Sequence, residues 1–204
     1  MPQKIPKSFY VREDVVTIAK ELLGATLVTN IGGILSSGKI VETEAYAAIN
    51  DRSSHAYMGR RTERNEMMYA AAGTVYVYLC YGVHKMINII TNRIDVPEAI
   101  LIRAVEPLQG LETMAIRTGK DASDPTLTKG PGNLTTAFGI TKALQGEVVF
   151  GKTIFTLEGE MKKILQEEIG ISKRIGIDGA GEDALLPYRF YLKNNKYVSA
   201  WPRK

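Results

Sequence analysis

The sequence predicts an α+β fold, with a single domain over residues 1–204 built on a mostly antiparallel, curved sheet with flanking helices and a protruding β-hairpin. Two observations support this fold class. The strand-like segments are joined mainly by turns, and no alternating strand–helix–strand pattern occurs, which favours antiparallel neighbours over a parallel sheet. The 204 residues are also sufficient to bury one substantial core.

The first half of the chain contains one helical pattern followed by several strands. Residues 13–23 are expected to form a helix, because apolar side chains recur at helical spacing and Gly24 follows as a stop signal. The segments at 32–33 and 36–38, rich in glycine and serine, are expected to form turns. Strands are expected at residues 26–29, 40–46 and 100–103.

A β-hairpin is predicted at residues 74–91. Residues 74–81 alternate apolar and tyrosine side chains, Tyr81-Gly82 offers a turn, and residues 85–91 form the return strand. Tyr81 is therefore expected at or near the exposed tip of the hairpin.

The second half of the chain mixes both kinds of element. Residues 107–117 are expected to form a helix, and the polar segment 119–129 an exposed loop. Gly130-Pro131 predicts a further helix to about Phe138, since proline is favoured in a first helical turn. Strands are expected at residues 147–157, 173–177 and 188–192, around a short helix near 161–168.

Composition excludes several classes of protein. The formal net charge of +4 is mildly basic, which permits nucleic-acid binding without arguing for it. No apolar run is long enough to span a membrane, and no signal-peptide core is seen. With one cysteine, intrachain disulfides are impossible, so a protein of the reducing cytoplasm is expected. The one cysteine, Cys80, and two histidines have no metal-site spacing. We therefore expect no metal and no cofactor.

Chemistry-bearing residues concentrate between residues 40 and 103, where both histidines and six of the ten tyrosines fall. On a strand over 40–46, Glu44 and Tyr46 share a face, because side chains alternate. A tyrosine ring beside a carboxylate suits a site that stacks a flat ligand and orients water. Taken alone, the strand could instead be an edge with a solvated acidic face; His55 and the aromatic strand that follows favour the site.

The hairpin and its surroundings allow similar alternatives. Tyr81 at the tip, with Lys85 close behind, could act as a wedge in a stacked duplex. Tyr76 and Tyr78 could be half-buried strand aromatics, which we accept for Tyr76. Arg103 ends an apolar run, so it is expected either in a site or paired with an acid such as Glu44 or Glu106.

Several arginines and lysines lie within or beside this region and could form a surface that faces phosphates. For some of them, the alternative is a solvated face interspersed with Glu63 and Glu66. The basic residues concerned are Arg52, Arg60, Arg61, Arg64, Lys85, Arg93 and Arg103. Gly130-Pro131 could open either an ordinary helix or one whose first amides hold a phosphate.

The ordered motifs of this chain resemble the alkyladenine (3-methyladenine) DNA glycosylase family of base-excision repair. The similarity covers nearly the whole chain. It is carried by Ile40–Tyr46, Asp51–His55, Gly59-Arg60, Thr62, Arg64-Asn65, Gly73, Tyr76–Tyr78, Tyr81-Gly82, Asn88, Leu101–Ala104, Glu106-Pro107 and Gly130–Gly132, and more weakly by Arg174–Ile177 and Arg189–Tyr191.

The resemblance implies a role for each matching residue. Glu44 would activate the water that attacks the deoxyribose C1′, and Arg103 would position Glu44, the water or a phosphate. Tyr81 would fill the gap that the flipped base leaves. The implied base pocket is Tyr46, His55, Tyr78 and Asn88, with Asn88 crowding the amino group of normal guanine. The expected DNA-backbone contacts are Arg60, Arg64, Lys85, Gly130 and Gly132.

The chain departs from the family pattern at three places. Asn133 stands where a basic residue is expected, which weakens one expected DNA contact. Gly181–Asp183 lacks a tryptophan commonly seen there, and Ala47-Ala48 replace the usual residue plus glycine. None of these touches Glu44 or Arg103.

The implied function is a monofunctional DNA repair glycosylase over residues 1–204. It would act as a monomer on double-stranded DNA containing damaged purines, and associate with the nucleoid through that DNA. It would flip out alkylated purines, with deaminated purines as further candidates, and leave an abasic site. The strand over 40–46 carries no lysine in an equivalent place, so the expected nucleophile is water.

Two other classes of function remain open at this level. One is a non-catalytic damage-sensing or architectural DNA-binding module, against which Glu44 argues because a pure binder has little use for a pocket carboxylate. The other is an RNA-binding or RNA-modifying protein that uses the same aromatic platform. An assay for strand breaks in alkylated duplex DNA after alkali treatment separates excision from binding.

Overall fold

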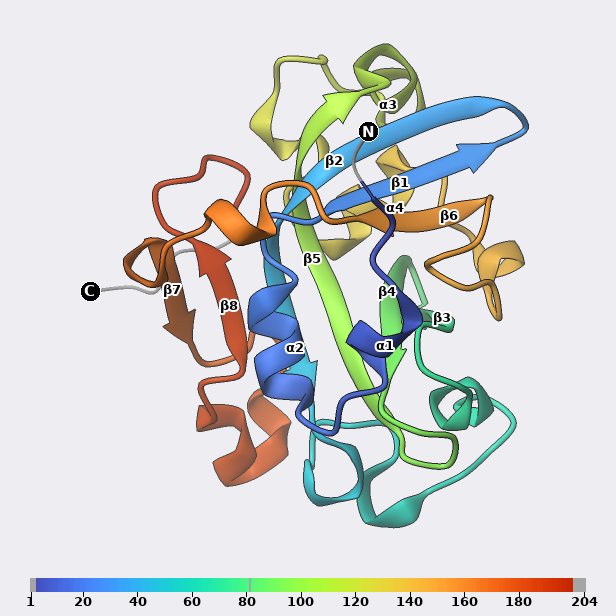
Figure 1. Cartoon of the computed structure of the whole chain (residues 1–204), viewed down its shortest axis with the longest axis vertical. Coiled ribbons are helices and arrows are strands. Elements are labelled where there is room, and N and C mark those ends of the chain that lie inside the picture. The colour runs from blue at the N-terminus through green and yellow to red at the C-terminus, as the bar shows by residue number, and fades with distance from the viewer. Residues whose placement is uncertain (1–2, 81, 200–204) are drawn as a thin grey trace.

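The computed structural model describes residues 3–80 and 82–199 and shows one twisted sheet with short helices around it (Figure 1). The α-helices are α1 (Lys7–Tyr10), α2 (Val15–Glu21), α3 (Leu111–Thr118) and α4 (Pro131–Ala137). The strands are β1 (Thr26–Ile31), β2 (Ile34–Tyr46), β3 (Val75–Cys80), β4 (His84–Thr91), β5 (Glu98–Gln109), β6 (Ile154–Leu157), β7 (Ile169–Ser172) and β8 (Arg189–Leu192).

The sheet confirms the predicted fold class. Its order is β3-β4-β5-β2-β1-β6, with β7 and β8 attached beside β2, and every pairing between these strands is antiparallel. Strand β2 is central, since it pairs with β5 on one side and with β1 and then β8 on the other. Register shifts beside Glu42 interrupt the β2–β5 ladder, and such bulges bend a strand.

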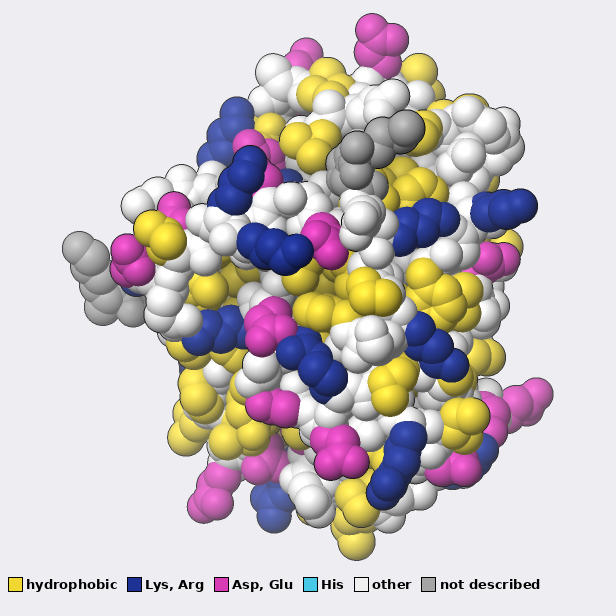
Figure 2. Space-filling model, in the orientation of Figure 1, with side chains coloured by type: hydrophobic (Ala, Val, Ile, Leu, Met, Phe, Trp, Pro, Cys, Tyr) yellow, Lys and Arg dark blue, Asp and Glu magenta, His cyan; other side chains and the backbone are white. Residues whose placement is uncertain are grey.

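Helix α2 lies in front of the sheet in Figure 1 and packs on β2, β5 and β8. It begins where Asp14 accepts a hydrogen bond from the backbone N–H of Thr17 at 3.0 Å. The apolar stripe predicted for residues 13–23 is the buried face of this helix, with Val15, Ile18 and Ala19 in the core. Around these elements, the face seen in Figure 2 mixes basic, acidic and apolar side chains.

Five sequence-based element assignments are wrong. Residues 107–109 continue β5, because they pair with residues 37–38 of β2; the helix starts only after Gly110, whose φ is 86°. For the same reason, residues 36–38 are strand and not turn. Of residues 147–157, only β6 is a strand, and the preceding part is held by isolated bridges.

The other two errors lie near the C-terminal third. Residues 173–177 are irregular, and the strand in this region is β7, which ends at Ser172. The expected helix near 161–168 is two short 3₁₀ turns, Met161–Lys163 and Gln166–Glu168. The hairpin was predicted correctly as β3 and β4, but its expected tip residue, Tyr81, lies outside the described residues.

Among the described residues, none of the helices is long and apolar enough to cross a membrane.

Candidate active site

Glu44 is a fully buried carboxylate on β2 whose two oxygens have different partners. Its Oε1 accepts a hydrogen bond from the backbone N–H of Ile175 at 2.8 Å and lies 3.2 Å from Nη1 of Arg103. Its Oε2 accepts a hydrogen bond from the hydroxyl of Tyr46 at 2.9 Å. The strand alternation predicted that Glu44 and Tyr46 share a face, and the structure brings them into direct contact.

Arg103 projects from β5 between two acidic side chains. Its Nε donates to Oε1 of Glu42 at 3.1 Å while Nη1 faces Glu44. Burial lowers the pKa of the Arg103 guanidinium, but Glu44 and Glu42 outweigh this and raise it overall. Of the two acids expected beside Arg103, Glu44 is present, whereas Glu106 pairs with Lys39 at 3.0 Å.

Glu42, one pleat from Glu44, is fully buried and gathers several donors. Its Oε1 accepts from Nε of Arg189 at 2.7 Å and from the hydroxyl of Ser199 at 2.8 Å, besides Arg103. Its Oε2 accepts from the backbone N–H of Ser199 at 2.7 Å. Sequence reasoning missed Arg189 and Ser199, because nothing local in the chain indicates that residues 147 and 157 positions away from Glu42 meet it.

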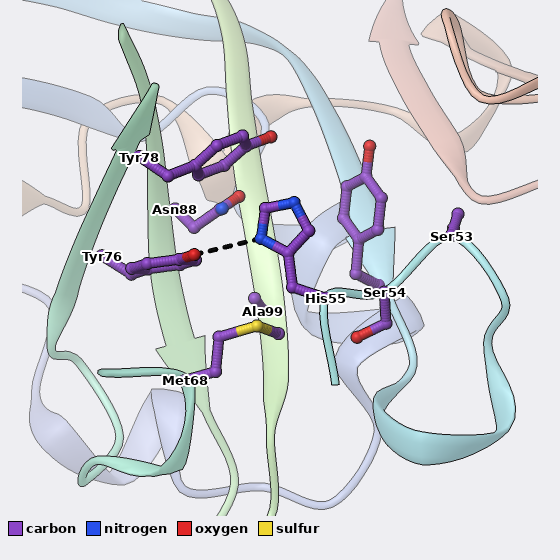
Figure 3. Close-up of a pocket in the computed structure, with 9 residues that line it drawn as sticks. Ser53, Ser54, His55, Met68, Tyr76, Tyr78, Asn88 and Ala99 are labelled. Atoms are coloured by element: carbon purple, nitrogen blue, oxygen red, sulfur yellow. Dashed lines mark hydrogen bonds between the residues drawn. The ribbon is translucent and has the colours of Figure 1, made fainter. Parts of the chain in front are cut away.

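A cavity beside Glu44 brings together the four residues expected to bind a base (Figure 3). The free space for a water-sized molecule is about 20 Å³. That is room for roughly one water and too little for a purine. The lining residues are Tyr46, Ser53, Ser54, His55, Met68, Tyr76, Tyr78, Asn88 and Ala99.

The aromatic wall of the cavity has a defined geometry. The rings of Tyr76 and Tyr78 stack at 28° with centroids 5.4 Å apart, and His55 meets Tyr78 edge-on at 78° and 4.6 Å. In Figure 3 the imidazole lies beside the two tyrosines, and its Nδ1 is 3.0 Å from the Tyr76 hydroxyl. Tyr76 is therefore more than the half-buried strand aromatic expected from sequence: it is fully buried and holds His55.

The protonation states of this wall follow from burial. Burial lowers the pKa of His55, and Arg64 and Arg60 lower it further, so the imidazole is neutral at pH 7. Burial raises the pKa of Tyr76 to about 12 and that of Tyr78 well above its ordinary value. Both phenols therefore keep their protons. The amide oxygen of Asn88 is buried and has no hydrogen-bond partner among the described residues.

A cleft of about 340 Å³ adjoins the cavity and shares Ser53, Ser54 and His55 with it. Arg52, Arg60 and Arg64 line this cleft and are exposed. The cleft therefore places three cations beside the cavity entrance.

Other expected DNA contacts lie near the hairpin. Lys85 is exposed, and α4 packs on β4 through a hydrogen bond from the Thr135 hydroxyl to the Lys85 carbonyl at 2.8 Å. Gly130 has a φ of 87°, and a Cβ on Gly132 would lie 2.9 Å from Nδ1 of His84. Gly132 thus lets α4 approach the hairpin closely, and the positive φ of Gly130 favours glycine there. Asn133, the departure noted above, donates to the Lys129 carbonyl at 2.9 Å.

Among the described residues, no group of three or more histidine, cysteine, aspartate or glutamate side chains could hold a metal ion.

Comparison with known proteins places the chain in a family. Residues 8–196 match the family model described as methylpurine-DNA glycosylase. The chain belongs to the methylpurine-DNA glycosylase family. It is therefore an enzyme that hydrolyses N-glycosyl bonds, as the sequence motifs implied, and not a non-catalytic binding module.

Curated relatives support the same assignment over nearly the full length. A protein of Carboxydothermus hydrogenoformans is 47% identical over 96% of this chain and 98% of its own. Proteins of Clostridium perfringens and Clostridium acetobutylicum are each 43% identical over 96% of this chain, and over 98% and 97% of their own lengths. All three bear the name "Putative 3-methyladenine DNA glycosylase".

Proposed function

We propose that this glycosylase excises N-methylated purines, such as 3-methyladenine, from double-stranded DNA, using a water molecule activated by Glu44. The observation that carries the proposal is the position of Glu44: a fully buried carboxylate beside Tyr46, which lines the aromatic cavity. The relatives' printed name points to the same lesion.

The hydrogen bonds of Glu44 indicate where the water binds. A carboxylate offers about four lone-pair sites over its two oxygens. Arg103 and Ile175 both occupy Oε1, whereas Oε2 accepts from Tyr46 alone among the described residues. A lone-pair site on Oε2 is therefore available to a water on the Tyr46 side, where the flipped nucleotide would enter.

The proposed reaction is a displacement at the sugar. The water oxygen bonds to C1′ of the flipped nucleotide as the bond from C1′ to the base nitrogen breaks, and Glu44 takes the proton of the water. The electron pair of the broken bond neutralises the positive charge of the methylated base, which leaves without a further proton. Glu44 also stabilises oxocarbenium character at the sugar, and Arg103 holds the carboxylate in place.

The walls of the cavity suit a methylated purine. Tyrosine rings attract cationic groups through their faces, and the neutral His55 adds no repulsive charge. A deaminated purine such as hypoxanthine is a second proposed substrate, since Tyr46, His55 and Tyr78 can stack on any flat base. This neutral base would leave as an anion and take up a proton from water. Asn88 would crowd the amino group of normal guanine and so protect undamaged DNA.

Entry of a base requires the cavity to open, because its free volume is about 20 Å³. Tyr46, Tyr78 and Asn88 stand on β2, β3 and β4, whereas His55 lies in the connection between β2 and β3. Connections move more readily than paired strands. We therefore assign the opening movement to the segment that carries His55.

The remaining contacts follow from the exposed cations. Arg60 and Arg64 in the cleft, and Lys85 on the hairpin, would hold the DNA backbone, with Gly130 and Gly132 close to it at the start of α4. Tyr81, which follows β3 in the chain, would occupy the gap left by the flipped base.

The test is single-turnover excision from duplex DNA carrying 3-methyladenine, read as strand breaks after alkali treatment. Glu44→Gln is expected to abolish excision, because an amide cannot accept the proton of the water. Its binding to DNA with an abasic-site analogue should survive. Near-normal excision by Glu44→Gln would exclude Glu44 as the general base, and no excision by the unaltered protein would overturn the proposed substrate.

A further inference from the structure

The guanidinium of Arg174 lies against the ring of Tyr46. Its central carbon is 4.8 Å from the centroid of the Tyr46 ring and 5.3 Å from that of Tyr188. Tyr46 lines the cavity and Arg174 does not. Arg174 is therefore on the side of the Tyr46 ring that is turned away from the cavity.

Asp51 balances the charge of Arg174. The two side chains form a double hydrogen bond, with Nη2 donating to Oδ1 at 2.9 Å and Nη1 donating to Oδ2, and both are buried. Burial by itself raises the pKa of Asp51, but hydrogen bonds from Arg174 and Ser53 outweigh it and lower the pKa overall. Asp51 is thus ionised, and the pair is close to neutral as seen from a distance.

Backbone contacts fix this pair in place. Nη1 of Arg174 donates to the carbonyl of Ala45 at 2.8 Å, and Nη2 donates to that of Asp183 at 3.1 Å. The first contact ties the guanidinium to the residue that precedes Tyr46 on β2. The charges of Arg174 and Asp51 consequently keep a constant distance from any ligand stacked on Tyr46.

We infer that Asp51 and Arg174 determine how this site discriminates between cationic and neutral bases, by setting the charge behind Tyr46. The inference rests on the proposed function, in which the base stacks on the cavity face of that ring. A base about 3.5 Å from one face would lie about 8 Å from the guanidinium behind the other. One unbalanced charge at that distance, with an effective dielectric constant of about 20–40, changes the binding of a cation roughly tenfold. A neutral base would respond little.

The test measures one ratio: the single-turnover excision rate of cationic 3-methyladenine over that of neutral hypoxanthine in the same duplex context. Asp51→Asn leaves Arg174 unbalanced and should lower the ratio roughly tenfold. Arg174→Gln leaves the anion and should raise it. The double variant removes both charges and should return to within about threefold of the unaltered protein.

The directions of these changes in the ratio distinguish an electrostatic effect from a purely structural support of Tyr46. If the pair only supports Tyr46, each variant lowers both rates together and the ratio stays constant, which would overturn the inference. Asp51→Asn and Arg174→Gln predict opposite changes, so either variant alone tests it if the other does not fold, as thermal unfolding will report. Where hypoxanthine is not excised, the same ratio is read from binding of the two duplexes by proteins that also carry Glu44→Gln.

The chain offers a matched control. Arg61 pairs with Asp95 and lies 4.5 Å from the centroid of the Tyr69 ring, which does not line the cavity. Asp95→Asn should leave the ratio unchanged. A shift equal to that of Asp51→Asn would show that any lost carboxylate acts through net charge and would overturn the inference. If the unaltered protein excises neither base, the proposed function itself is overturned.

Discussion

Glu42 and Glu44 are neighbours on one face of β2, but their hydrogen-bond partners indicate different roles. Among the described residues, Oε2 of Glu44 accepts a hydrogen bond from Tyr46 alone. By contrast, both oxygens of Glu42 accept from Arg103, Arg189 or Ser199. Glu42 thus has a structural role and supports the side chain of Arg103. Its contact with two buried arginines makes it a stability residue whose loss leaves positive charge uncompensated.

Glu42→Gln is therefore expected to cost about 3–5 kcal/mol of the free energy of unfolding, the usual range for breaking a buried ion pair from one side. Urea unfolding monitored by circular dichroism measures this. Excision at a temperature where the variant is folded should fall far less than in Glu44→Gln. Equal loss of excision in both folded variants would show that Glu42 takes part in the chemistry.

His55 gives the site a predicted dependence on pH. Burial and two nearby arginines lower its pKa below the ordinary value of about 6.5. Just below pH 6.5, His55 therefore binds a proton in the unfolded chain more readily than in the folded protein. The stabilising contribution of the neutral imidazole is complete above pH 6.5 and is lost as the pH falls through the lower folded pKa.

Replacing His55 by glutamine should flatten the fall in the free energy of unfolding as the pH decreases below 6.5, measured by urea titration at each pH. His84→Gln is the matched control, because His84 is the other histidine and is exposed. The same flattening in His84→Gln would show that the pH dependence does not come specifically from His55 in the cavity. Excision of cationic bases should also weaken once His55 is charged.

At the scale of elements, the hairpin of β3 and β4 carries two exposed apolar side chains near the connection between its strands. Leu79 is 47% exposed and Val83 is 71% exposed. Exposed apolar groups cost little on a surface that is buried against DNA bases, and Lys85 follows directly. These flanking residues support the wedge interpretation of Tyr81, whose own position the structure does not describe.

Tyr81→Ala is expected to weaken the flipped state by roughly 1–3 kcal/mol, the worth of one aromatic–base stack. Single-turnover excision should fall most on paired lesions, where flipping is costly, and much less on lesions in mismatches. Tyr78→Ala should reduce excision in every context, because it removes a wall of the cavity. Equal losses for Tyr81→Ala in both contexts would exclude the wedge.

The sequence predicted the elements whose pattern is local. Alternation identified β3 and β4, and the glycine–proline pair identified α4. It failed at residues 107–109, where helical spacing was overridden by pairing with β2, and at 173–177, where Arg174 and Ile175 are held by side-chain contacts instead of a ladder. Tertiary contacts decide such segments.

The candidate site divides in the same way. Residues close together in the chain, from Glu44 to Asn88, could be grouped by strand faces and family motifs. The supports behind them could not, because Ile175 reaches Glu44 across 131 positions and Arg174 reaches Asp51 across 123. Antiparallel return of β8 beside β2 creates these contacts, and no short pattern in the sequence encodes that return.

At the scale of the whole molecule, the net charge of +4 is too small to dominate DNA binding, so the placement of cations matters more than their number. The face in front of α1 and α2 mixes both signs (Figure 2). By contrast, the cleft beside the cavity gathers Arg52, Arg60 and Arg64. Arg61 differs from its neighbours, because Glu66 and Asp95 already pair with it.

This difference predicts the salt dependence of binding. Each phosphate that a cation neutralises releases counterions, which adds roughly 0.9 to the slope of log K against log salt for duplex DNA. Arg60→Ala and Arg64→Ala should each lower the magnitude of that slope by about 1 and weaken binding evenly across sequences. Arg61→Ala should leave the slope nearly unchanged, since its charge is satisfied within the protein.

Fluorescence anisotropy on an abasic-analogue duplex between 50 and 200 mM salt measures all three. If Arg61→Ala lowers the slope as much as Arg64→Ala does, the DNA path covers the whole arginine segment and is not confined to the cleft that opens beside His55.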